Sequence, residues 1–324
     1  MSQQGHDHAP MPPKPGTGLV FDAEFVRHDP GTEHPECPDR YRAIKRALDQ
    51  SGLMARLSRI PARRATEDEV HLCHTRAYLA AVRHDIGRRS PALSTGDTGL
   101  CEHSLDVAML AVGAALSAVD AVMTGREKNA FAAVRPPGHH ATASRGMGFC
   151  IFNNAAVAAR YARQVHDVDR VLIIDWDVHH GNGTQDIFYE RGDVLFCSLH
   201  GNPEDCYPHF LGYRDEVGRG KGEGFNVNYP MGPGTGFDKW GKALKAALAK
   251  IKAYGPDAVV VSLGVDAYKD DPISFFKLTS EDFMRTGAAI AKLKKPTLFV
   301  MEGGYAIEAI GVNTVNVLEG FADA

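Results

Sequence analysis

The stretch 171–183 constrains the fold of this chain more than any other. Its first four residues, 171–174, are a continuous run of Val, Leu and Ile, which is typical of a strand buried on both faces of a parallel sheet. Asp175, Asp177 and His179 follow at alternate positions, and an extended segment would point all three to the same side. Because open α/β sheets bind ligands at the carboxyl ends of their strands, this spacing favours a metal site over a merely solvated strand end.

Strand-like and helix-like segments alternate along the rest of the chain. The expected strands are 18–22, 129–134, 171–174, 194–200, 258–264 and 297–302. This order predicts an α/β fold with a mainly parallel sheet and helices on both faces. We find no repeat and no long linker, so we expect one domain over 18–324 after a disordered, proline-rich leader at 1–17. A long connection rich in Gly and Pro, 201–236, is of the kind found around active sites.

Composition excludes several classes of function. The formal charge of −4 comes from 36 basic and 40 acidic residues, and without a basic block we expect no nucleic-acid partner. The most apolar long stretch, 105–123, contains Asp106 and Asp120, so it predicts a core helix and no membrane partner. The N-terminus lacks a secretory pattern and the six cysteines form no Cys-x-x-Cys pair, which favours a cytoplasmic protein with reduced thiols.

Separate predicted strands end in unusual chemistry, at 136–140, 175–179, 264–266 and 302–305. A parallel sheet gathers such ends on one edge, so these groups can converge. Asp177, His179 and Asp266 then make a plausible ligand set for one divalent cation, with positions left open for water and substrate. Asp175 would accept a hydrogen bond from a neighbouring imidazole.

The remaining groups at these ends suit catalysis. His139 and His140 are not needed as metal ligands, and either could take a proton from an attacking water at neutral pH. Tyr305, behind two glycines, could direct its hydroxyl at a developing oxyanion. Together they predict metal-assisted hydrolysis of an amide, whereas a hydrogen-bonded histidine pair and a packing tyrosine are the structural alternatives.

The motifs at 34–40, 135–141, 148–154, 175–183, 262–266 and 302–305 resemble those of the zinc-dependent deacetylases, which comprise histone deacetylases and acetylpolyamine amidohydrolases. The motifs stand in family order. The resemblance implies an arginase/deacetylase-like fold, a catalytic domain over 18–324 and a bacterial, class II-like member of the family.

For the metal and the histidines, the resemblance implies one Zn²⁺ per chain, bound by Asp177, His179 and Asp266. It further implies that His140 is the general base and acid. His139 would be an electrostatic helper held by Asp175.

For the remaining site, the resemblance implies that Tyr305 polarises the substrate carbonyl and that Phe149 and Tyr207 wall an acyl tunnel. Asn182 takes the place of the aspartate that many relatives present to His140. An amide carries no negative charge, so His140 should be less basic than with aspartate.

The resemblance also implies a structural potassium ion, held by oxygens of Asp175, Asp177, His179, Ser198 and Leu199. The segments 184–212 and 271–279 are most similar to acetylpolyamine amidohydrolases, whereas the short loop 27–40 is closer to class II histone deacetylases. We therefore expect a broad entrance that accepts small acetylated amines, acetylpolyamines included, and exposed acetyl-lysine. Carboxylates at that mouth would favour a cationic substrate, and the candidates are Asp22, Glu24, Glu33 and Asp97.

Two other functions are compatible with parts of the pattern. The segment 262–272 faintly resembles a ureohydrolase motif, but His180 and Gly181 stand where a dinuclear site would need another carboxylate. A non-catalytic, acyl-ligand-binding homologue is the second alternative, and the presence of His140 and Tyr305 argues against it. A homo-oligomer is possible.

Overall fold

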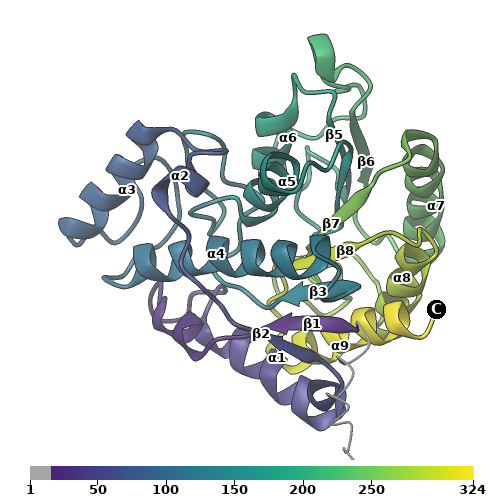
Figure 1. Ribbon diagram of the computed structural model, residues 1–324, viewed down its shortest axis with the longest axis horizontal. Helices are drawn as coiled ribbons and strands as arrows, with labels where there is room; N and C mark the ends of the chain where they lie inside the picture. Colours follow the sequence, from purple (N-terminus) through teal and green to yellow (C-terminus); the bar gives the residue numbers. More distant parts are fainter. Residues whose placement is uncertain (1–15) are drawn as a thin grey trace, which may run out of the picture.

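A single eight-stranded parallel sheet organises the structure (Figure 1). The computed structural model describes residues 16–324, and residues 1–15 of the predicted leader lie outside the described residues. The strand order is β2-β1-β3-β8-β7-β4-β5-β6, and every neighbouring pair is parallel. The strands are β1 (Thr17–Val20), β2 (Ser58–Ile60), β3 (Asn129–Ala132), β4 (Val171–Asp175), β5 (Val194–Gly201), β6 (Asn226–Met231), β7 (Ala258–Leu263) and β8 (Thr297–Met301).

Helices cover both faces of this sheet, as the alternating pattern predicts. In Figure 1, α4 and α5 lie on one side, and α1, α9, α8 and α7 lie on the other. The helices are α1 (Pro38–Gln50), α2 (Glu67–Val70), α3 (Arg76–Gly87), α4 (Ser104–Met123), α5 (Asn154–Val165), α6 (Asn182–Phe188), α7 (Phe237–Tyr254), α8 (Ser280–Ala291) and α9 (Ile307–Ala322), with the 3-10 helices η1 (Ala23–Arg27), η2 (Leu53–Ala55) and η3 (Gly220–Gly222). The predicted fold class is therefore confirmed.

The central strands are apolar because both of their faces are covered. Every residue of β4, β5, β7 and β8 is buried. Within the described part of the chain, α4 is long and apolar enough to cross a membrane, but 78% of its apolar window is buried against the rest of the protein. It is thus a helix of the core.

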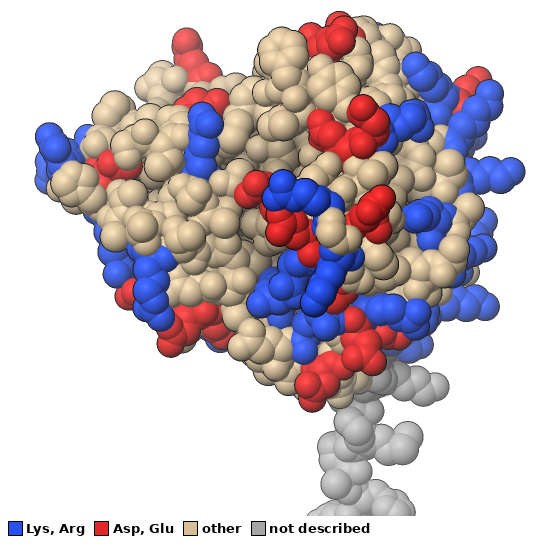
Figure 2. Space-filling model, turned by 90° about the horizontal axis from the view of Figure 1, so that it is seen from above, with Lys and Arg blue, Asp and Glu red and all other residues tan. Residues whose placement is uncertain are grey.

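α7 shows how the outer layer is built. Trp240, Leu244 and Ile251 face the core, whereas its five lysines are exposed. Figure 2 shows basic side chains along the side of the molecule where α7 lies, and intermingled acidic and basic groups elsewhere on that face. The helix is therefore held by its apolar stripe and solvated by its lysines.

Three details of the expected fold are wrong. β4 ends at Asp175 and an irregular turn follows, so strand alternation does not orient Asp177 and His179. The connection 201–236 contains the strand β6, which was not predicted because its asparagines and Pro230 are unfavourable in strands. Proline is tolerated there because β6 is an edge strand. Thr17, placed in the leader, already pairs with Asn129 in β1.

The contact between α8 and α9 should not tolerate a side chain at Gly287. A Cβ there would lie 2.0 Å from the backbone oxygen of Val317, so the two helices would have to separate. We expect Gly287→Ala to lower the free energy of unfolding by about 1–3 kcal/mol, measured by urea unfolding.

Gly241 in α7 is the matched control, because its nearest neighbour to an added Cβ is a Phe237 ring atom at 3.4 Å. Gly241→Ala should stabilise the protein by up to about 1 kcal/mol through helix propensity. Equal effects of the two substitutions would contradict the close packing of α8 on α9.

Candidate active site

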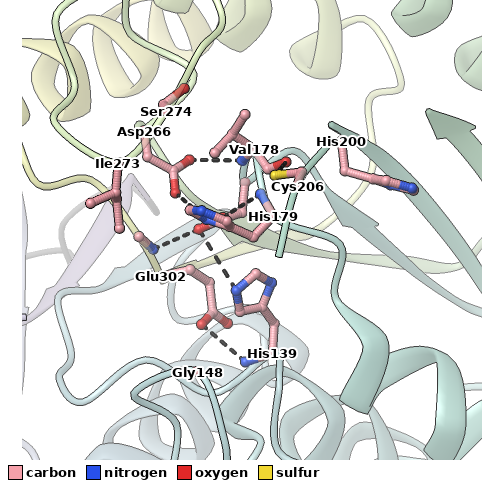
Figure 3. A network of polar contacts seen from close by, with 12 residues as sticks. His139, Gly148, Val178, His179, His200, Cys206, Asp266, Ile273, Ser274 and Glu302 are labelled. Carbon is pink, nitrogen blue, oxygen red and sulfur yellow. Dashed lines mark hydrogen bonds and ion pairs between the residues drawn. The ribbon is translucent and has the colours of Figure 1, made fainter. Parts of the chain in front are cut away.

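The predicted strand-end groups converge at the carboxyl edge of the sheet (Figure 3). β3 leads into the segment that carries His139 and His140, and β4 leads into Asp175–His179. β7 leads into Asp266, and β8 leads into Tyr305. Four strands that are neighbours in the sheet therefore supply one site, although their residues are far apart in the sequence.

Asp177, His179 and Asp266 form a buried cluster of ligand atoms. His179 Nδ1 lies 3.0 Å from Asp177 Oδ1 and 3.1 Å from Asp266 Oδ2. Donors bound to one zinc-sized cation at 2.0–2.2 Å would lie roughly 3.4 Å apart. The spacing and the donor chemistry, one imidazole with two carboxylates, therefore fit a single divalent cation.

Backbone amides hold the two carboxylates in place. Asp266 Oδ1 accepts a hydrogen bond from the Val178 amide at 2.7 Å, and Asp177 Oδ2 accepts one from the Gly303 amide at 2.8 Å. A Cβ at Gly303 would lie 2.3 Å from Asp177 Oδ2 and 2.5 Å from Asp266 Oδ2. Only glycine at this position lets the chain approach both ligands.

The charges of this cluster favour a cation. Burial and the neighbouring Asp177 raise the pKa of Asp266 to about 8. Burial acts in the same direction on Asp177, but the charges of His139 and His179 outweigh it and hold the pKa of Asp177 well below its usual range. A divalent ion would relieve the repulsion between the two carboxylates.

His139 is arranged to carry a positive charge. Its Nδ1 lies 2.8 Å from Asp175 Oδ2. Burial lowers its pKa, but the charges of Asp175 and Asp177 outweigh burial and raise the pKa of His139 to about 10. Asp175 Oδ1 accepts a second hydrogen bond from the Asp177 amide at 3.1 Å, so the same carboxylate links this histidine to the turn that carries Asp177 and His179.

His140 is arranged to stay neutral. Its Nδ1 lies 2.7 Å from Asn182 Oδ1, and the Asn182 amide nitrogen lies 3.5 Å from the Met147 sulfur. The amide oxygen accepts from Nδ1–H, which leaves Nε2 as the unprotonated nitrogen. Burial and the charges of His139 and His179 lower the pKa of His140 well below its usual value. Adjacent histidines therefore differ in protonation state.

Tyr305 lines the same pocket as His140, on a loop held from two sides. Its amide donates to Asp271 Oδ2 at 2.7 Å. Arg40 donates to the backbone oxygen of Gly304 at 2.6 Å and to that of Glu302 at 2.5 Å, and its guanidinium carbon lies 4.8 Å from the centre of the Tyr305 ring. Burial raises the pKa of Tyr305 well above its usual value, so its hydroxyl remains a donor.

Arg40 is itself fixed by a buried ion-pair network. Glu36 Oε1 accepts from Arg40 at 3.0 Å and from Arg135 Nε at 2.9 Å, and Glu36 Oε2 accepts from Arg135 at 2.8 Å. All three side chains are almost completely buried. The network joins the short loop 27–40 to the end of β3 and to the Tyr305 loop.

One pocket leads from the surface to these groups. Phe149 and Tyr207 line it from different loops, and their rings lie 5.8 Å from Tyr305 and 5.1 Å from His140, respectively. The lining residues are Asp97, His140, Gly148, Phe149, His179, Asp205, Cys206, Tyr207, His209, Ile273, Phe275 and Tyr305. The structure thus places both residues expected for the tunnel on its wall.

The mouth differs from the sequence-based expectation. Of the four candidate carboxylates, Asp97 alone lines the pocket. Asp22 caps η1 by accepting from the Glu24 amide at 2.9 Å, Glu24 pairs with Arg64, and Glu33 is exposed outside the lining. Asp205 is the mouth carboxylate that sequence reasoning missed; its place beside the tunnel residue Tyr207 is the signal that could have found it.

Comparison with known proteins agrees with this geometry. The histone deacetylase domain matches residues 34–321, so the chain belongs to that family. Acetylpolyamine amidohydrolase 1 of Pseudomonas aeruginosa is 58% identical over 197 residues, which cover 61% of this chain and 57% of that protein. A histone deacetylase-like amidohydrolase of the same organism is 36% identical over 309 residues, which cover 93% of this chain and 80% of that protein. The match thus spans little more than half the length of the first relative.

Two solved structures are similar over nearly the whole chain. The HD domain of HDA15 superposes with a TM-score of 0.90 at 38% identity, covering 95% of this chain and 88% of that one. An acetylpolyamine aminohydrolase from Burkholderia pseudomallei superposes with a TM-score of 0.86 at 32% identity, covering 94% and 98%. The predicted family and its fold are therefore confirmed.

The hydrogen bond from His140 to Asn182 makes a prediction about pH. Asn182→Asp would place a negative charge on the Nδ1–H, which favours the imidazolium and raises the pKa of His140 by roughly 1–3 units. A base must be neutral to act, so the acidic limb of the kcat/KM profile should move to higher pH.

The profile is to be recorded for the parent, Asn182→Asp and Asn316→Asp. Asn316 donates to Ser280 between α9 and α8, so its substitution controls for an added charge elsewhere. An unchanged acidic limb in Asn182→Asp would show that His140 does not set it.

Proposed function

We propose that this protein is a zinc-dependent amidohydrolase that removes acetyl groups from acetylated amines. The observation that carries the proposal is the convergence of three groups at one pocket that Phe149 and Tyr207 line. These are the neutral His140, the Tyr305 hydroxyl, and the ligand set of Asp177, His179 and Asp266. The names of the similar proteins support the same reaction, removal of an acyl group from an amine.

The side chains suggest a division of work. A zinc ion on the ligand set would supply a Lewis acid for the acetyl carbonyl and the attacking water. His140 Nε2 accepts the proton of that water and later returns it to the leaving amine. Tyr305 donates a hydrogen bond to the carbonyl oxygen as negative charge develops there. The His139 imidazolium, held by Asp175, stabilises the same developing charge and keeps His140 from protonation.

The alternatives receive less support. A dinuclear ureohydrolase would need more carboxylates beside the ligand set, but the residue after His179 is His180, whose ring turns away to Gln185 at 3.1 Å. A non-catalytic binding protein has no use for a neutral base and a protonated tyrosine at the pocket, and here His140 and Tyr305 both line it.

Two variants should distinguish the residues that bind the metal from those that act only in catalysis. Asp266→Ala removes a proposed ligand, so metal content and activity should fall together. Tyr305→Phe removes only a hydroxyl, so it should keep its zinc and lose roughly 10²–10³-fold in kcat with little change in KM. Metal content is measured by elemental analysis and activity with an acetylated amine. Full metal occupancy in Asp266→Ala would show that the ligand set is wrong.

A potassium ion is the second ion that we propose, on oxygens of Asp175, Asp177, His179, Ser198 and Leu199. Asp175 is paired in register with Ser198. The Ser198 hydroxyl lies 2.7 Å from His200 Nδ1, and His200 Nε2 lies 2.9 Å from the Gly212 carbonyl. A carbonyl only accepts, so Nε2 carries the proton. Burial lowers the pKa of His200 to about 4, so the ring is neutral and Ser198 must donate to Nδ1. The lone pairs of the serine oxygen then remain available to a cation.

Potassium should therefore stabilise the folded protein. Thermal unfolding in KCl should give a higher Tm than in choline chloride of equal ionic strength, because a bound ion stabilises by RT ln(1 + [L]/Kd). Ser198→Ala should abolish the difference. Ser262→Ala is the control, since Ser262 pairs with Asp175 on the opposite side. A potassium effect lost only in Ser262→Ala would move the site to that strand.

The mouth of the pocket favours acetylated amines that carry a positive charge away from the acetyl group. Asp97 and Asp205 line it, with the apolar Ile273 and Phe275. We propose that acetylpolyamines and exposed acetyl-lysine are both accepted, with carboxylates attracting the cationic part. The kcat/KM values for acetylputrescine, acetylspermidine and an acetyl-lysine peptide should then lie within about a thousandfold of one another, roughly 4 kcal/mol.

Asp205→Asn tests the electrostatic part of this prediction. It should raise KM for acetylspermidine more than for a neutral acetylated alkylamine of similar length. Asp215→Asn, an exposed change in the same loop outside the pocket lining, should affect neither. Equal effects on charged and neutral substrates would exclude charge recognition by Asp205.

A further inference from the structure

Glu302 is a buried carboxylate at the site to which the proposed mechanism gives no task. It follows β8 directly and has no exposed surface. Its Oε2 accepts hydrogen bonds from the backbone amides of Gly138 at 2.6 Å and His139 at 3.2 Å. Figure 3 shows the carboxylate directed at the His139 backbone. The side chain therefore reaches from the end of β8 to the turn that carries both histidines.

The turn that Glu302 holds is fixed through its carbonyls by other segments: the His139 oxygen accepts from the amides of Gly183 at 3.0 Å and Thr184 at 3.2 Å. Gly138 packs so closely on the next segment that a Cβ would lie 2.5 Å from the Asn154 nitrogen and 2.7 Å from the Phe152 oxygen. The amides of Gly138 and His139 point toward the protein interior, where an unpaired donor is costly. Both bonds end on a single oxygen of Glu302.

The backbone around Glu302 holds the other parts of the site. Its carbonyl accepts from Arg40, whose guanidinium lies under the Tyr305 ring. The next amide, of Gly303, donates to the metal ligand Asp177. A displacement of this segment would therefore move the histidines, the ligand set and the tyrosine together.

We propose that Glu302 is a positioning residue: as a double hydrogen-bond acceptor, it holds the Gly138–His139 backbone so that both histidines face the pocket. The role needs an oxygen at the correct reach, because both bonds use Oε2, and Oε1 has no hydrogen-bond partner among residues 16–324. His139, Cys150 and Glu302 also form a group that could hold a metal ion. The structure favours the hydrogen-bonding role, because Glu302 Oε2 already accepts from two amides and His139 Nδ1 is already bonded to Asp175.

Three substitutions of Glu302 distinguish the effect of its side-chain length from the effect of its charge. Glu302→Gln keeps the length and one carbonyl oxygen but loses the charge. Glu302→Asp keeps the charge but is too short to reach the turn, and Glu302→Leu keeps the bulk without any acceptor. We expect kcat within about threefold of the parent for Glu302→Gln, and at least tenfold lower kcat for the other two, with KM and zinc content unchanged.

Amide hydrogen exchange supplies a readout that does not depend on activity. The kinetic arm rests on the proposed deacetylase activity, whereas exchange of the peptide that spans 135–142 reports the clamp itself. In Glu302→Asp, exchange there should rise at least tenfold, while a peptide from α4 keeps its protection. Glu302→Gln should exchange like the parent.

The results for these variants decide whether Glu302 acts as a hydrogen-bond acceptor or through its charge. Loss of kcat in Glu302→Gln with retention in Glu302→Asp would overturn the proposal in favour of a charge effect. Parental kinetics and parental exchange in Glu302→Asp would overturn it outright. If Glu302→Leu fails to fold, the Gln and Asp pair still decides. If the parent hydrolyses no acetylated amine, the exchange data remain valid and only the proposed function fails.

Discussion

The burial of carboxylates at one edge of the sheet is the constraint on which the rest of the structure depends. Asp175, Asp177, Asp266 and Glu302 have no exposed surface, and a buried charge is tolerated only when it is paired or hydrogen-bonded. The fold meets this requirement with imidazoles, with backbone amides and with the proposed cation. Because the partners come from different strands, charge compensation also fixes how the strand ends lie relative to one another.

The same need explains why the two adjacent histidines differ. The Asp175 carboxylate favours the imidazolium in His139. Opposite His140, the uncharged Asn182 adds no such charge, so burial and the charges of His139 and His179 keep that ring neutral. A second aspartate would add a further buried negative charge and raise the pKa of His140. The amide of Asn182, in place of a carboxylate, therefore helps to keep His140 neutral and able to accept a proton.

Much of this was predictable from the sequence because strand-end residues are local signals. An apolar run followed by Asp175 shows both a buried strand and a site at its end, and a parallel sheet brings Asp266 to the same edge. What could not be predicted depends on long-range contacts. Arg40 contacts the Tyr305 loop across 264 positions of sequence, and loop conformation alone brings Asp205 to the mouth. The irregular turn after β4 shows that Asp177, His179 and Asp266 come together although the local geometry differs from the expected extended segment.

The strand order also has a consequence for how the protein is made. β8 lies between β3 and β7, so the half of the sheet that carries the histidine pair and the half that carries the ligand set have no direct strand contact. During synthesis, β1 to β7 leave the ribosome before the strand that joins them, and pairing of such distant segments is slow. The segments that carry Asp177 and Asp266 are therefore made before the strand that lies between them and the histidine turn. Until β8 is inserted, Asp177 lacks the Gly303 amide and the His139 turn lacks the Glu302 carboxylate, so neither half of the site has its final form.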